Sequence, residues 1–71
     1  MRGHYIPKIA VPVSVALRRG VIMRGDAFVL ATDRVLDMLN GPAAFFPLRL
    51  DDGGIRLVAK REVNWVSPLR D

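Results

Sequence analysis

The side chains that could take part in acid-base or nucleophilic chemistry are few, and they stand apart in the sequence. One histidine, His4, lies near the start of the chain, and two carboxylates are adjacent at Asp51 and Asp52. Ser14 belongs to an alternating strand pattern, and Ser67 precedes a proline. Catalysis of these kinds needs a nucleophile or a base with an orienting partner. No such arrangement is apparent, so we predict that the protein is not an enzyme.

Candidate residues for metals and cofactors are equally scarce. The chain has 71 residues, with one histidine and no cysteine, whereas structural metal sites are typically built from several such side chains. Asp51-Asp52-Gly53-Gly54 is typical of a hairpin turn and not of a phosphate-binding loop that opens a helix. We therefore predict no metal site, no cofactor and no disulfide.

Positive charge is the clearest chemical bias. Eleven Lys and Arg residues oppose seven Asp and Glu residues, which gives a formal net charge of +4. The cations are scattered along the chain, and no run exceeds two. Such a charge suits contact with nucleic acid or with an acidic partner, and it equally suits a solvated surface.

The composition indicates a small domain that associates. A chain of this size buries only roughly 60% of the surface that its unfolded form exposes, yet 51% of the residues are hydrophobic. We therefore expect the core to be completed against a second copy or a protein partner, with homo-oligomer formation as the leading prediction. No run of about 18 apolar residues occurs, and the start lacks the features of a signal peptide, so we expect no membrane span and a cytoplasmic location.

The first half of the chain predicts an arm followed by two strands. Residues 1–10 are interpreted as an N-terminal arm, and residues 11–71 as a single domain. Strict alternation predicts a strand at Val11–Leu17, followed by a basic turn that ends in a glycine. A long second strand is predicted at Val21–Ala31. Gly25 interrupts it, as expected where a strand bends to serve two sides of a small barrel.

A short helix is predicted next. Thr32 or Asp33 can accept hydrogen bonds from the first free N–H groups, and Gly41 followed by Pro42 ends the helix. Its apolar stripe is too short to be stable unless it packs, so we assign it to the core rather than to an interface. The stripe consists of Val35, Leu36, Met38 and Leu39.

Three further strands complete the prediction. A strand at Phe45–Leu50 precedes the hairpin turn Asp51–Gly54 and a strand at Ile55–Lys60. Lys60–Glu62 makes a short connection, and Val63–Val66 is a brief final strand. Five short strands with one small helix between the second and third predict a mainly β fold, a small five-stranded Sm-like or SH3-like barrel.

Four short motifs can be compared with a known family. They are Leu17-x-x-Gly20, Arg24-Gly25, Asp37-x-Leu39-Asn40 and the run from Leu57 to Pro68, LVAKREVNWVSP. Together they resemble the Sm-like family, including its bacterial Hfq branch, over residues 13–68. The helix ending in Leu-Asn, followed by Phe-x-Pro-Leu, is also similar to uncharacterised small bacterial proteins.

The resemblance implies a ring-forming, RNA-binding barrel. In that reading Lys60 and Arg61 match the uridine-contacting lysine and histidine of the Hfq branch. A short final strand at an open sheet edge would pair with the second or fourth strand of a neighbouring copy, in a head-to-tail interface that closes as a ring. Val63, Trp65 and Val66 would then lie near the interface, although a core position is an equally good interpretation of Trp65.

Two functional hypotheses follow. The favoured one is a non-catalytic interaction module that assembles with itself or with a protein partner, without a small-molecule cofactor. The alternative is an RNA-binding oligomer whose cationic and amide side chains contact phosphates and bases. The residues assigned to RNA contact are Arg18, Arg19, Arg24, Asn40, Lys60 and Arg61.

Overall fold

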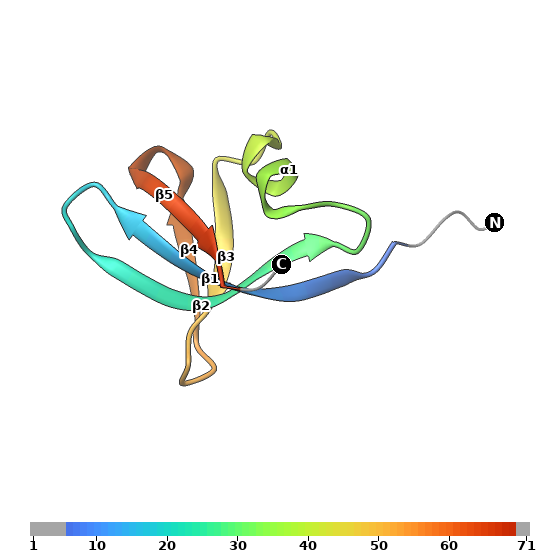
Figure 1. Ribbon diagram of the computed structural model, residues 1–71, viewed down its shortest axis with the longest axis horizontal. Coiled ribbons are helices and arrows are strands. Elements are labelled where there is room, and N and C mark those ends of the chain that lie inside the picture. The colour runs from blue at the N-terminus through green and yellow to red at the C-terminus, as the bar shows by residue number, and fades with distance from the viewer. Residues whose placement is uncertain (1–5, 70–71) are drawn as a thin grey trace.

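One antiparallel sheet and one short helix make up the part of the chain that the computed structural model describes, residues 6–69 (Figure 1). This confirms the mainly β prediction, with the helix between the second and third strands. The elements are β1 (Lys8–Leu17), β2 (Ile22–Leu30), α1 (Val35–Asn40), β3 (Phe45–Arg49), β4 (Ile55–Ala59), the 3₁₀ turn η1 (Lys60–Glu62) and β5 (Val63–Pro68).

The five strands are hydrogen-bonded in the order β4-β3-β2-β1-β5. Within residues 6–69 no strand pairing joins β4 to β5, so the sheet is open and these two strands are its edges. The closed barrel expected from the sequence is not formed by this pairing. An open sheet presents unpaired backbone groups along both edges.

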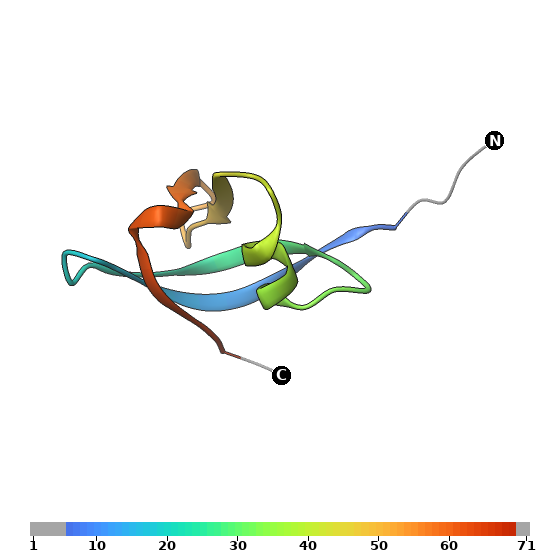
Figure 2. The same cartoon turned by 90° about the horizontal axis from the view of Figure 1, so that it is seen from above.

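The hairpin of β1 and β2 is the longest feature of the molecule. Its two strands run together from Lys8 opposite Leu30 to Ala16 opposite Ile22, and they extend along the long axis in Figure 2. Gly20 has a φ of 83°, a backbone conformation that the turn requires and that glycine adopts without a steric penalty. The basic turn predicted from the sequence is therefore present.

β2 curves along its length (Figure 1). Gly25 lies where β3 approaches β2. A Cβ atom at this position would collide with the backbone carbonyl of Arg49. β3 pairs with β2 only beside it, at Asp26 and Ala27. Glycine is therefore needed because two backbones approach closely, as well as for the bend.

The core lies on one face of the sheet, under α1. It consists of Val13, Val15, Ala27, Val29, Val35, Phe46, Leu48 and Val58. Three of the four residues of the predicted helix stripe contribute to it, since Val35 is buried and Met38 and Leu39 pack against the cluster. Leu36, the fourth, is exposed. No helix within the described ranges is long and apolar enough to cross a membrane.

Several element ends differ from the prediction. β1 begins at Lys8, so the last three residues of the predicted arm belong to the sheet, and β5 continues to Pro68. His4 lies outside the described residues. The helix cap was wrongly predicted: Arg34 occupies the N-cap, and its N–H donates to the carboxylate of Asp37 at 2.9 Å. The turn after β2 explains the shift, because the N–H of Asp33 donates to the carbonyl of Leu30.

Candidate interaction surfaces

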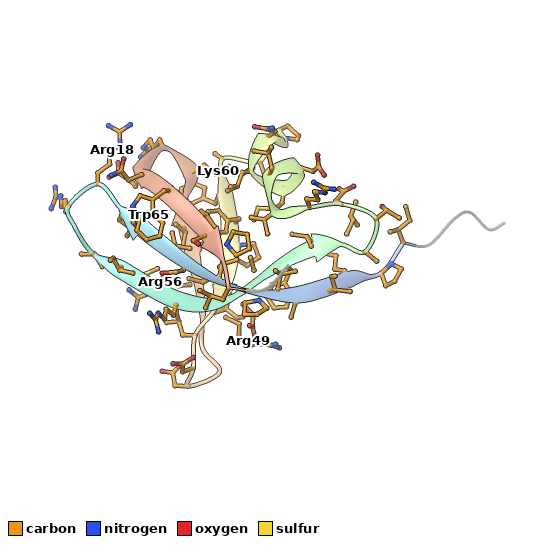
Figure 3. All side chains as sticks on the ribbon, in the orientation of Figure 1. Arg18, Arg49, Arg56, Lys60 and Trp65 are labelled. Carbon is orange, nitrogen blue, oxygen red and sulfur yellow. The ribbon has the colours of Figure 1, made fainter. Side chains whose placement is uncertain are left out.

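The side chain of Lys60 makes hydrogen bonds within the protein. Its ammonium group donates to the carbonyl oxygens of Met38 at 2.9 Å and of Gly41 at 3.2 Å, and the side chain is partly buried. Figure 3 shows the side chain directed toward α1. A cation at these carbonyls satisfies acceptors that a helix end leaves free and complements its negative dipole end. The sequence assigned Lys60 to RNA contact, and the structure adds this helix-capping role.

Asn40 and Arg61 flank the two ends of the Lys60 contact, since Asn40 precedes Gly41 and Arg61 follows Lys60. Asn40 is the last residue of α1 and is exposed, next to the Gly41 carbonyl that Lys60 contacts. Arg61 follows Lys60 in η1, and its guanidinium lies 3.9 Å from the carboxylate of Glu62. The fold thus brings Asn40 and Lys60 to one region, at the end of the helix.

The arginines of the hairpin form a separate group. Arg18 and Arg19 lie in the turn between β1 and β2, and Arg24 lies on β2 opposite Ser14. All three are exposed, and among residues 6–69 none of them forms an ion pair. The backbone N–H of Arg18 donates to the carbonyl of Glu62, which holds the turn beside η1.

The two serines and Asp52 lie in a strand pair and in a turn within the described part of the chain. Ser14 is buried and pairs with Ser67 across β1 and β5. The carboxylate of Asp52 accepts the N–H of Gly54 at 2.8 Å, which is the contact of a turn residue. Residues 6–69 contain no group of three or more His, Cys, Asp or Glu side chains that could hold a metal ion.

The predicted interface residues lie on both faces of β5. Val63 and Val66 are partly buried and pack against the core. Trp65 points to the opposite face, opposite Ala16, and its exposed fraction is 45%. Of the two interpretations left open for Trp65, the core position is therefore wrong. An exposed indole on an edge strand remains available for contact with another molecule.

A second apolar surface lies on the outer face of β3 and β4, away from the core. β4 directs Val58 toward the core, so Ile55 and Leu57 face outward with exposed fractions of 56% and 68%. Pro47 lies opposite Leu57, and Phe45 is exposed two residues before it. We call Phe45, Pro47, Ile55 and Leu57 the outer patch.

Sequence reasoning did not single out the outer patch. The alternation of β4 shows that Ile55, Leu57 and Ala59 share one face, yet a core strand gives the same signal. The choice of face depends on β3, which places Phe46 opposite Val58 and so turns Val58 inward. This choice leaves the more apolar face of an edge strand in solvent.

Comparisons with protein-family models, curated proteins and solved structures gave no match to this chain.

Proposed function

We propose that this protein is a non-catalytic interaction module that assembles with itself, or binds a protein partner, through an open strand edge and the outer patch. The observation that carries the proposal is the position of Ile55 and Leu57. Both are highly exposed on β4, and β4 is an edge of the sheet. Proteins that remain monomeric usually protect such an edge with charges, proline or a covering segment.

The edge of β4 has little of this protection in the described residues. Its five residues include one charge, Arg56, and no proline. Arg56 belongs to the face of Val58, so the outward side chains of β4 itself, at Ile55, Leu57 and Ala59, are all apolar. Arg49 of β3 lies opposite Ile55 at one end of this face. An exposed apolar face on an unpaired strand gains both buried area and hydrogen bonds when another strand is added.

We also propose that the fold is an open variant of the small Sm-like or SH3-like barrel. The strand order supports this relationship, because the first and last strands pair while β2 lies between β1 and β3. The curvature of β2 and the glycine that permits close approach of β3 support it as well. In such a variant, pairing between molecules would satisfy the edges that a closed barrel satisfies internally.

Light scattering coupled to size exclusion tests the function, with absorbance recorded at 260 and 280 nm in low and high salt. We expect a particle of at least twice the chain mass of 7.9 kDa, free of nucleic acid and stable in high salt, because apolar association does not weaken with salt. A particle that carries nucleic acid and loses it at high salt would favour the RNA-binding hypothesis instead.

Two leucines provide a matched pair of variants. Leu57→Lys places a charge on the β4 edge and should reduce self-association by about tenfold or more. Leu36→Lys changes a leucine of similar exposure, 64% against 68%, on the helix away from that edge, and should leave the mass unchanged. The proposal would be contradicted if Leu57→Lys and Leu36→Lys changed the particle mass equally. It would also be contradicted if the parent protein were monomeric and captured no protein partner.

A further inference from the structure

The backbone of β4 has a regular set of free hydrogen-bonding groups on its outer edge. The N–H of Lys60 donates to the carbonyl of Ala44, and the N–H of Leu50 donates to the carbonyl of Gly54. Because antiparallel pairs alternate, the even-numbered residues of β4 bond to β3. The odd-numbered residues therefore direct their N–H and C=O groups away from the sheet. They are Ile55, Leu57 and Ala59.

The residues with free N–H and C=O groups are arranged symmetrically about Leu57, with Ile55 on one side and Ala59 on the other. We propose that β4 pairs with β4 of a second copy, antiparallel, about a two-fold axis at Leu57. The inference rests on the proposed function and specifies its partner. Leu57 then lies opposite Leu57 of the second copy, and Ile55 lies opposite Ala59, so all the free groups are satisfied. The two outer patches become one continuous surface.

Charge at the two ends of β4 supports this orientation. Asp51 and Asp52 lie in the turn before the strand, and η1 follows it with two cations, Lys60 and Arg61, and one carboxylate, Glu62. The two aspartates and Arg61 are exposed. Antiparallel pairing brings the acidic turn of each copy beside the basic end of the other, and this happens twice because of the two-fold axis. Parallel pairing would bring like charges together at both ends.

The edge of β5 is a poorer partner for β4. The N–H of Leu69 donates to the carbonyl of Pro12, so by the same alternation Ser67 and Trp65 bond to β1. Val66 and Pro68 are left on the free edge, and Pro68 has no N–H to donate. The pairing of β5 with β1 is also irregular between Ala16 and Leu17. Pairing between β4 and β5 would build a head-to-tail ring, whereas β4 with β4 closes at two copies.

A single cysteine tests the two-fold axis, because the chain contains no cysteine of its own. Paired residues of this kind have Cα atoms about 5.5 Å apart, within the range that a disulfide spans. We expect Leu57→Cys, after mild oxidation, to give a disulfide-linked dimer on a non-reducing gel. Leu36→Cys is the matched control on α1 and should give little disulfide-linked dimer. A parent assembly in which both variants cross-link equally would overturn the two-fold pairing and leave the proposed function standing. A monomeric parent would also overturn the two-fold pairing, and a monomeric parent that captures no protein partner would overturn both proposals.

Reversal of the end charges gives a second test that does not depend on Leu57. Asp51→Lys and Arg61→Asp should each weaken the dimer by roughly two- to ten-fold at low salt. The double variant should recover the parent affinity, since it restores opposite charges across the interface. Both side chains are exposed, so the variants are expected to fold. Additive weakening in the double variant would overturn the antiparallel arrangement.

Discussion

The ammonium group of Lys60 lies 2.9 Å from the carbonyl oxygen of Met38, although the two residues are 22 positions apart. This contact joins the end of β4 to the end of α1, which otherwise has no basic residue in its last turn. A helix of six residues is too short to be stable by itself. Lys60 therefore helps to hold α1 over the core.

Replacement of Lys60 tests this capping role. Lys60→Met keeps the length of the side chain and removes its charge and donors, so it should lower the free energy of unfolding by about 1–2 kcal/mol. Chemical denaturation measures the change. Arg19→Met is the control, because Arg19 is exposed in the turn between β1 and β2 and forms no ion pair among residues 6–69, and it should have almost no effect. Equal stability of the two variants would contradict the helix-capping role.

Gly25 should tolerate no side chain. Gly25→Ala places a methyl group against the carbonyl of Arg49, and we expect a loss of about 1–3 kcal/mol because the backbone of β3 must move. Gly20→Ala is the comparison: its added methyl group meets no neighbouring atom, and the cost of a φ of 83° is about 1 kcal/mol. Thermal unfolding of both variants measures the difference, and a smaller loss at Gly25 than at Gly20 would contradict the close approach.

Two leucines of the sheet should separate folding from assembly. Leu48 is fully buried and Leu57 is highly exposed. Leu48→Ala should lower the free energy of unfolding by about 2–5 kcal/mol, through lost burial and a cavity. Leu57→Ala should change the stability of the monomer by less than about 0.5 kcal/mol and should weaken self-association. Denaturation at several protein concentrations distinguishes the two effects, because only association depends on concentration.

The ion pair between Arg49 and Asp26 should contribute little. Its N–O distance is 2.9 Å, but the side chains are 44% and 34% exposed, and solvent screens the attraction. Asp26→Asn should therefore lower the free energy of unfolding by less than about 1 kcal/mol, and by less still in high salt. A larger, salt-independent loss in denaturation experiments would show that the carboxylate has a role beyond this surface pair.

Much of the fold follows from local patterns in the sequence. Alternation of apolar residues predicted the strand β1, because side chains in a strand alternate between two faces whatever the partner strand. Glycines and an Asp-Asp-Gly-Gly run predicted the turns, and Gly53 has the φ of 87° that such a turn requires. The helix was predicted in place because its apolar stripe and its Gly-Pro stop are local signals.

Tertiary structure alone decided which strands became edges and what their side chains face. Strand order depends on contacts between distant parts of the chain, so the sequence by itself left open whether Trp65 belonged to the core and which face of β4 was buried. The same holds for Lys60, since a lysine in a turn carries no sign that a helix end lies within reach. The local patterns determined the strands, the turns and the helix. Long-range packing determined the open edge of β4, and the proposed function rests on that edge.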